Sequence, residues 1–254
     1  MRRKEKLKSF FTVPVMASMA VLAGVLVLAI FAGVISPHDP NALDVSKILQ
    51  NPSSEFLLGT DKSGRDLFSR LIFGARSTMF SAICVVALSA VIGIPVGMAA
   101  GYFRGFADKV IMRVCDIVLS FPSLLLAFVL VAAFGRGIEN VIIALGILYV
   151  PMLAKLTRSL VLVESGKVYV EAAHSIGFSD GHIMLREIFP NIVSTVVIQL
   201  MLDVGYAILD LSAMSFLGLG VQPPTADWGA MLEEGRILIT SSPVVAHAHG
   251  YVIV

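Results

Sequence analysis

The sequence has little charge. Asp, Glu, Lys and Arg make up 15% of its 254 residues, whereas a soluble domain carries about 25% of these residue types. Hydrophobic residues reach 57%, and the mean hydropathy is +0.87. The formal net charge is only +1, and no basic patch alternates with aromatic residues, so nothing indicates nucleic-acid binding. This composition indicates a protein that lies largely within a membrane.

Cysteine is scarce as well, and the common catalytic motifs are missing. Cys84 and Cys115 lie in or beside apolar segments, which favours packing over a disulfide or a metal site. The sequence has no CxxC, HExxH or GxSxG pattern, and no Ser, His and Asp arrangement that resembles a triad. The phosphate-binding pattern GxxxxGKS/T is also missing. We therefore expect no enzyme, no cofactor, no metal site and no ATP binding by this chain alone.

Five apolar blocks are present, each long enough to cross a bilayer as a helix, which takes about 20 residues. Backbone that spans a membrane must satisfy its own hydrogen bonds, and these blocks lack the short alternating pattern of barrel strands. The sequence therefore predicts an all-α, polytopic bundle. The predicted spans are Val13–Ile35, Met79–Gly101, Val114–Phe134, Val141–Leu162 and Ile192–Leu219.

The basic segment 1–12 precedes the first block and predicts the orientation of the chain. The block is longer than the about 7–15 apolar residues of a signal peptide, which favours an uncleaved span. Most of the 19 Lys and Arg residues fall in segments that a cytoplasmic N-terminus places inside. We therefore predict a cytoplasmic N-terminus over residues 1–12 and one transmembrane domain over residues 13–254.

A polar, helix-prone stretch, EAAHSIGFSDGHIMLREIFP, separates the last two blocks. We expect a helix over Val168–Ser175, followed by Gly177 at a position that usually needs a positive φ. Ser179 or Asp180 is suited to cap a second short helix, which we expect to end near Pro190. The stretch therefore predicts a helix, a turn and a helix outside the membrane.

This stretch resembles the EAA loop of the membrane subunits of bacterial ATP-binding-cassette (ABC) importers. The resemblance rests on Glu171, Ala172, Ala173, Gly177, Ile188 and Pro190 at their spacing. It implies that a loop over residues 164–190 docks as a coupling helix on an ATPase subunit, and that these residues carry the contact. In this interpretation Glu171 is a helix-end charge or polar contact, and the small side chains of Ala172 and Ala173 permit close approach. Without the motif, the alternative is a surface helix with Ile183, Leu185 and Ile188 in the lipid headgroups.

Further motifs are similar to those of the peptide and nickel branch of these permeases. They are GTDxxGRD from Gly59, SFLGLG from Ser215 and DWG from Asp227. The resemblance implies an inner-membrane protein with a second permease subunit, often in a heterodimer, two ATPase subunits and a periplasmic solute-binding protein. It favours di- or oligopeptides as cargo, with nickel as the alternative. The family closes with a sixth span, but Val244–Val254 is too short to cross, so we expect a truncated sixth span.

Polar residues inside the last predicted span need an explanation, because an ionisable group costs a few kcal/mol at the bilayer centre. Gln199, Asp203 and Asp210 form a stripe on one helix face. They either line the translocation path or hold helices together, and the sequence leaves both open. A secondary carrier that uses the two Asp residues as a relay is a further alternative, although the internal repeats typical of such carriers are not found.

Other span residues give structural expectations. We expect Asp116 to pair with Arg113 three residues earlier, and Lys155 and Arg158 to extend to the inner headgroups. Gly93, Gly97 and Gly101 recur every four residues around Pro95, and they predict close helix packing with a kink at the proline. His174 and His182 are expected to be surface groups.

Overall fold

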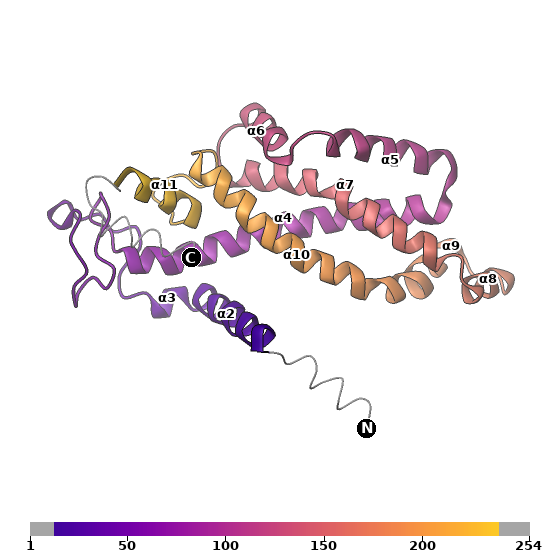
Figure 1. Ribbon diagram of the computed structural model, residues 1–254, viewed down its shortest axis with the longest axis horizontal. Helices are drawn as coiled ribbons and strands as arrows, with labels where there is room; N and C mark the ends of the chain where they lie inside the picture. The colour runs from indigo at the N-terminus through magenta and orange to yellow at the C-terminus, as the bar shows by residue number, and fades with distance from the viewer. Residues whose placement is uncertain (1–12, 239–254) are drawn as a thin grey trace, which may run out of the picture. The chain divides into compact units, whose positions relative to one another are not determined.

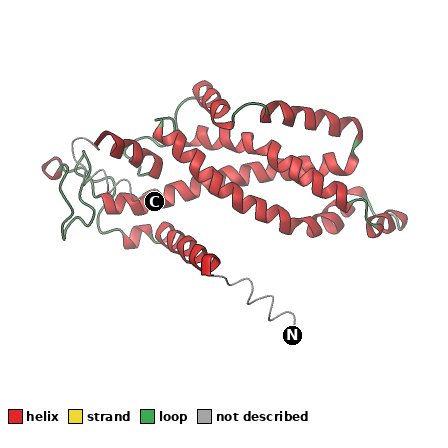
Figure 2. Cartoon of the chain, viewed as in Figure 1, coloured by secondary structure: helices red, strands yellow, loops and turns green. Residues whose placement is uncertain are grey.

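A computed structural model describes residues 13–238. The predicted cytoplasmic segment 1–12 and the short segment Val244–Val254 lie outside the described residues. Within the described part the regular elements are helices, and strand-like pairing is limited to one isolated bridge between Thr60 and Asp66 (Figure 2). The contacts form two compact units. The first holds the residues up to Met79 and those from Val221 onward, and the second holds Phe80–Gly220.

The first unit contains short helices, a long loop and the beginning of a long helix. Leu67 and Met231 are buried at its centre, and Leu49, Leu58 and Leu71 pack around them. The elements are α2 (Val13–Ile30), α3 (Ala32–Ile35), η1 (Val45–Lys47), the first turns of α4 (Leu67–Phe103) and α11 (Trp228–Leu238).

The second unit is a helical bundle in which α7 (Ile138–Glu164) contacts α5, α6 and α10 (Figure 1). One buried cluster joins α4, α6, α7 and α10, and a second joins α4, α7 and the EAA loop to the start of α10. The elements besides α4 and α7 are α5 (Gly105–Leu119), α6 (Ser123–Phe134), α8 (Val168–Ser175), α9 (Asp180–His182), the π-helix η2 (Ile183–Ile188) and α10 (Phe189–Phe216).

The described residues include three helices long and apolar enough to cross a membrane. They are α4, α7 and the continuous helix Asp180–Phe216. Helices α5 and α6 make a fourth span only if they are counted together, because they are bent by 91°. The first predicted block is helical as α2, which has 18 residues, followed by α3. The all-α bundle is therefore confirmed, with three or four spans of this kind in the described part instead of five.

The predicted third span is wrong as a single helix, since α5 ends at Leu119 and α6 begins at Ser123. The cause is local. Pro122 lacks an N–H and disfavours helical geometry in the residue before it. The Ser120 hydroxyl also donates to the carbonyl of Ile117, 2.7 Å away, at the end of α5. The break therefore opens a corner between two apolar helices.

Close packing of α4 on α7 is confirmed, because the three glycines face the α7 backbone. A Cβ on Gly93 would lie 3.1 Å from the carbonyl oxygen of Val150, and one on Gly101 would lie 2.8 Å from that of Arg158. A Cβ on Gly97 would press on the backbone between these two positions. Helix α4 continues through Pro95 to Phe103.

Candidate functional site

The EAA loop forms the predicted helix and turn. Helix α8 covers Val168–Ser175, and Gly177 follows with φ +87°. A Cβ at Gly177 would meet no atom within 4 Å, so the backbone conformation alone favours glycine there. The Ser179 hydroxyl then accepts a hydrogen bond from the His182 N–H at 3.4 Å, which caps the short helix α9. Of the two predicted capping residues, Ser179 performs the role.

The expectation that this second helix ends near Pro190 is wrong. The chain stays helical from Asp180 to Phe216, and Pro190 lies in the first turn of α10. The π-helical segment Ile183–Ile188 just before it explains how this happens, because its bonding shifts from i→i+4 to i→i+5. The carbonyl of Glu187 then accepts from the Asn191 side-chain amide at 2.7 Å.

The predicted contact residues separate into an exposed set and a buried set. Glu171 and Ala172 are exposed. Ala173 and Ile188 are buried within the cluster that joins the loop to α4, α7 and α10. Because Ile188 is 0% exposed, it anchors the loop and does not itself offer a surface to a partner. Ile183 is buried in the same cluster, which contradicts the alternative that places it in the headgroups.

Tyr102, near the end of α4, joins both arms of the EAA loop. Its hydroxyl donates to Asp180 Oδ1 at 2.8 Å. The same Tyr102 hydroxyl oxygen lies 3.1 Å from His174 Nε2. The Tyr102 and His174 rings are stacked with centroids 6.0 Å apart. Sequence reasoning missed Tyr102, because nothing in the motif points to a residue 78 positions before Asp180.

Tyr169 fixes the base of the loop in a similar way. Its hydroxyl donates to Glu164 Oε1 at 2.8 Å and accepts from Asn191 Nδ2 at 3.2 Å. Burial, followed by the bond to Glu164, raises the pKa of Tyr169 to about 12. The hydroxyl therefore stays protonated at neutral pH and remains a donor, which ties α8 to the end of α7 and the start of α10.

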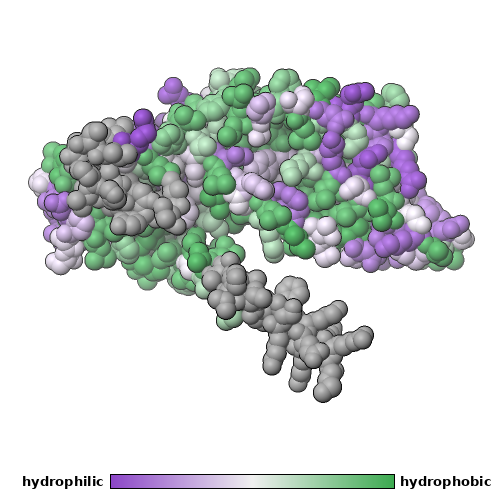
Figure 3. Space-filling model, in the orientation of Figure 1, coloured by the Kyte–Doolittle hydropathy of each residue, from purple (hydrophilic) through white to green (hydrophobic). Residues whose placement is uncertain are grey.

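The outer surface of the loop mixes polar and apolar groups. The hydrophilic side chains of the second unit gather at the end that holds α8, whereas hydrophobic ones predominate further along the bundle (Figure 3). Within the EAA loop itself, four large apolar side chains are exposed, namely Val168, Ile176, Phe178 and Leu185. Exposed apolar groups surrounded by polar ones are typical of surfaces that bind another protein.

Two ion pairs connect α5 to α7 near the same end, and one of them corrects an expectation. Arg158 binds Asp108, with one guanidinium nitrogen 2.6 Å from Asp108 Oδ2. Lys155 binds Asp116 at 2.5 Å, so Asp116 pairs across the bundle and not with Arg113. Both basic side chains therefore make their ion pairs with acids on α5.

Two residues of the polar stripe, Asp203 and Asp210, line a cavity of about 420 Å³ in the second unit. Asp203 and Asp210 come from α10, and Tyr149 comes from α7. Asp210 Oδ2 accepts from the Tyr149 hydroxyl at 2.8 Å. Gln199 Nε2 donates to Asp203 Oδ1, also at 2.8 Å. The structure therefore brings Asp203 and Asp210 to one cavity, while Gln199 supports Asp203.

The GTDxxGRD motif forms a buried ion network in the first unit. Asp61 Oδ2 binds Arg65 Nε at 2.6 Å, and a second Arg65 nitrogen lies 3.2 Å from Glu234 of α11. Arg70 is 1% exposed and donates to the carbonyl of Pro224 at 3.1 Å. Gly64 has φ +76°, and a Cβ there would collide with the backbone of Asp44. The motif thus attaches the loop between α3 and α4 to α11 through the Arg65–Glu234 ion pair.

The DWG motif packs on the first turns of α4 in the same unit. Asp227 accepts from the Thr78 hydroxyl at 2.9 Å, and its other oxygen accepts from the Gly229 N–H at 3.1 Å. The Trp228 indole donates to the carbonyl of Leu71 at 3.1 Å and covers Gly74. The two motifs therefore stabilise one unit together.

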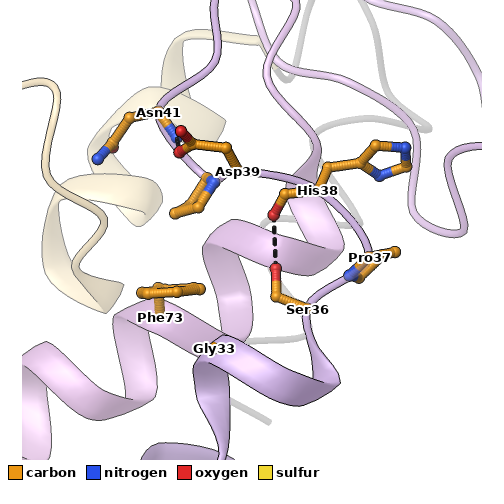
Figure 4. Close-up of a pocket in the computed structure, with 8 residues that line it drawn as sticks. Gly33, Ser36, Pro37, His38, Asp39, Asn41 and Phe73 are labelled. Carbon is orange, nitrogen blue, oxygen red and sulfur yellow. Dashed lines mark hydrogen bonds between the residues drawn. The ribbon is translucent and has the colours of Figure 1, made fainter.

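A second cavity of about 540 Å³ lies in the first unit, beside the turn that follows α3 (Figure 4). The Ser36 hydroxyl donates to the His38 carbonyl at 2.7 Å, and Phe73 of α4 closes one side. His38 Nδ1 lies 3.3 Å from Asp66. Among the described residues, no group of three His, Cys, Asp or Glu side chains is placed to hold a metal ion.

Comparison with known families accounts for these features. The family described as binding-protein-dependent transport system inner membrane component matches residues 93–254. The chain belongs to this family. A second family, the N-terminal TM domain of oligopeptide transport permease C, matches residues 14–52. The protein is therefore an ABC importer permease of the peptide and nickel branch, a multi-pass protein of the inner membrane.

Individual relatives are similar over most of the permease. The glutathione transport system permease protein GsiD of Pectobacterium atrosepticum is 41% identical over 234 residues, which cover 90% of this chain and 78% of the relative. GsiD of Shigella dysenteriae is 43% identical and covers 91% of the chain and 77% of the relative. Family membership implies ATPase and binding-protein partners. It sets aside a secondary carrier that works alone and agrees with the expectation that the permease is not an enzyme.

Proposed function

We propose that this permease forms part of the path for a small peptide delivered by the binding protein. The observation that carries this proposal is the 41–43% identity to GsiD permeases, which are named for glutathione transport, over nine-tenths of the chain. Glutathione is itself a short peptide, so the likeness favours di- or oligopeptides over a bare metal ion. The described residues also provide no cluster of metal ligands.

The EAA loop is the proposed contact for the ATPase subunit. Glu171, Ala172 and the exposed apolar side chains supply the docking surface, Gly177 sets the turn, Ala173 and Ile188 hold the loop on the bundle, and Pro190 is an exposed residue in the first turn of α10. We infer that the loop moves as a rigid body with the ATPase, because its inner face belongs to the same buried cluster as α4, α7 and α10. Tyr102 and Tyr169 supply further attachment.

The second permease subunit of the proposed assembly is a different chain, so that the path is a heterodimer, as the branch resemblance implies. The N-terminus of this chain is assigned to the cytoplasm, which places the EAA loop on the side where ATP is available. Support comes from the distribution of Lys and Arg along the sequence.

Uptake by the reconstituted importer tests this proposal. The complete complex is placed in vesicles with ATP on the ATPase side, and loaded binding protein is added on the other. Glutathione, a dipeptide and Ni²⁺ are compared as cargo. We expect ATP-dependent uptake of peptides and none of Ni²⁺. Uptake of Ni²⁺ without uptake of either peptide would contradict the proposed cargo, and uptake without ATPase subunits would contradict the proposed mechanism.

A further inference from the structure

The cavity beside α10 has the chemistry of a cation site, and the inference below rests on the proposed peptide cargo. Asp203, Tyr206 and Asp210 are spaced by three and four residues, so they lie on one face of α10. Tyr149 and Met152 of α7 form a second wall. The corner between α5 and α6 provides the third wall with Phe121 and Ser123. All these residues belong to the second unit.

The two carboxylates in this cavity have unused bonding capacity. Asp203 is 4% exposed, and among the described residues its side chain accepts a hydrogen bond only from the Gln199 amide, at Oδ1. Asp210 likewise accepts a single hydrogen bond, from Tyr149 at Oδ2. A carboxylate accepts about four hydrogen bonds. One oxygen on each Asp therefore has no hydrogen-bond partner among the residues that the structure describes.

Among the described residues, no basic side chain forms an ion pair with either of these acids. In the described part of the chain, neither Asp203 nor Asp210 makes a salt bridge, whereas Asp108 and Asp116 each pair with a basic residue of α7. A charged side chain within a span is costly unless a partner or water stabilises it. Two carboxylates without a salt-bridge partner on one wall therefore favour a positively charged ligand in the cavity.

The size and the aromatic lining identify the class of cation. A volume of about 420 Å³ is that of a pocket for a small organic molecule, not for a bare ion. Tyr206 lines the cavity together with the two Asp residues and is 58% exposed. Aromatic faces attract organic ammonium groups. Among the groups that line the cavity, His and Cys, the usual transition-metal ligands besides carboxylates, are missing, and Met152 offers only a thioether sulfur.

We propose that Asp203 and Asp210 bind the N-terminal ammonium group of the transported peptide, with Tyr206 against the same group. The remaining lining is mostly apolar, so peptide side chains of different kinds are accommodated there. Such a site gives the path a preference for peptides with a free amino terminus, in addition to the selection made by the binding protein.

The test uses the complete reconstituted importer with Asp203→Asn and Asp210→Asn, which keep the shape of each side chain and remove its charge. The probes are trialanine and N-acetyl-trialanine, each at a concentration that saturates the binding protein. We expect each Asn variant to lower the maximal uptake of trialanine at least fivefold and to leave that of N-acetyl-trialanine, which lacks the ammonium group, at its wild-type value. We expect Asp210→Glu to restore part of the trialanine uptake. Glu139→Gln, which removes a charge from an exposed position at the start of α7, is the matched control and keeps wild-type uptake.

A second variant keeps the proposal testable if the Asn variants do not assemble. Tyr206→Leu replaces a side chain that is more than half exposed, so it does not disturb the core, and it should reduce uptake of trialanine severalfold. Wild-type rates of trialanine uptake in Asp203→Asn, Asp210→Asn and Tyr206→Leu would overturn the ammonium site while leaving the peptide importer intact. Absence of trialanine uptake by the wild type would instead contradict the proposed function. Uptake of Ni²⁺ by the wild type that the Asn variants abolish would overturn both the peptide cargo and the ammonium site and would reassign the cavity to a metal.

Discussion

Single residues of the EAA loop have separate roles that the motif alone does not distinguish. Gly177 is selected by its φ of +87°, since no neighbouring atom would meet a side chain there. Ala173 and Ile188 are selected by burial, because both lie in the cluster beneath the loop. Glu171 and Ala172 are exposed and remain available to a partner. The motif therefore contains a glycine needed for the turn, two residues needed for packing, and two residues on the surface.

Replacing Gly177 by valine should weaken the complex with the ATPase. A left-handed conformation costs an L-residue roughly 1–2 kcal/mol, and β-branched side chains tolerate it poorly. We expect the fraction of ATPase that co-purifies with the permease to fall about five- to thirtyfold, because this is the population shift that such an energy produces. Membrane insertion should be unchanged.

Two further substitutions control this measurement. Gly181→Val places the same side chain in α9, where a Cβ also meets nothing within 4 Å and no positive φ is needed. It should leave co-purification intact. Gly177→Asn should give an intermediate loss, since asparagine accepts positive φ more readily. Wild-type co-purification of Gly177→Val would count against the proposed docking surface.

At the level of helices, local features could be predicted from the sequence and long-range ones could not. The bounds of α8, the turn at Gly177 and the cap at Ser179 follow from neighbouring residue types. The pairing of Arg158 with Asp108 joins positions 50 residues apart, and only the packing of α5 on α7 determines it. Pro190 predicts a helix end that does not occur, because a π-helix, which has no simple sequence signature, precedes it and the chain stays helical.

The sequence also identified Asp203 and Asp210 as unusual but could not assign their role. Their spacing predicts a shared face, and the cost of charge in a membrane predicts a reason for their presence. The cavity, however, depends on the break between α5 and α6, which brings Phe121 and Ser123 to the same place. A third span predicted as one straight helix would leave no such corner.

Substituting Tyr102 by phenylalanine tests the connection between α4 and the EAA loop. The change removes the hydrogen bond to Asp180 and the contact with His174 Nε2, while the ring and its stacking remain. Each lost hydrogen bond is worth about 0.5–1.5 kcal/mol. We expect solute uptake per ATP hydrolysed to fall about two- to tenfold, measured in reconstituted vesicles.

A double-mutant cycle with Asp180→Ala separates this role from general destabilisation. If the two residues act through their mutual bond, the double variant should be no worse than the more damaging single variant. Strictly additive losses, or an unchanged ratio of uptake to ATP hydrolysis in Tyr102→Phe, would show that this bond does not connect the loop to α4.

For the whole chain, the proposed orientation in the membrane is open to a direct test. In a background without Cys84 and Cys115, single cysteines are introduced at exposed positions Asn51 and Gly166. An impermeant maleimide should label Asn51→Cys in intact spheroplasts and Gly166→Cys only in inverted vesicles. The reverse labelling pattern would place the loop outside the cell and contradict docking on a cytoplasmic ATPase.

The π-helical segment Ile183–Ile188 also sets the rotational phase between the EAA loop and α10. In an α-helix, two residues five apart point about 140° away from each other, given 3.6 residues per turn. Ile183 and Ile188 are nevertheless both fully buried, because bonding from i to i+5 brings them back into alignment. An uninterrupted α-helix with the same sequence would rotate α9 relative to the bundle and would present another side of it to the proposed ATPase partner. The wider turn of the π-helical segment thus determines which face of the EAA loop is available for docking.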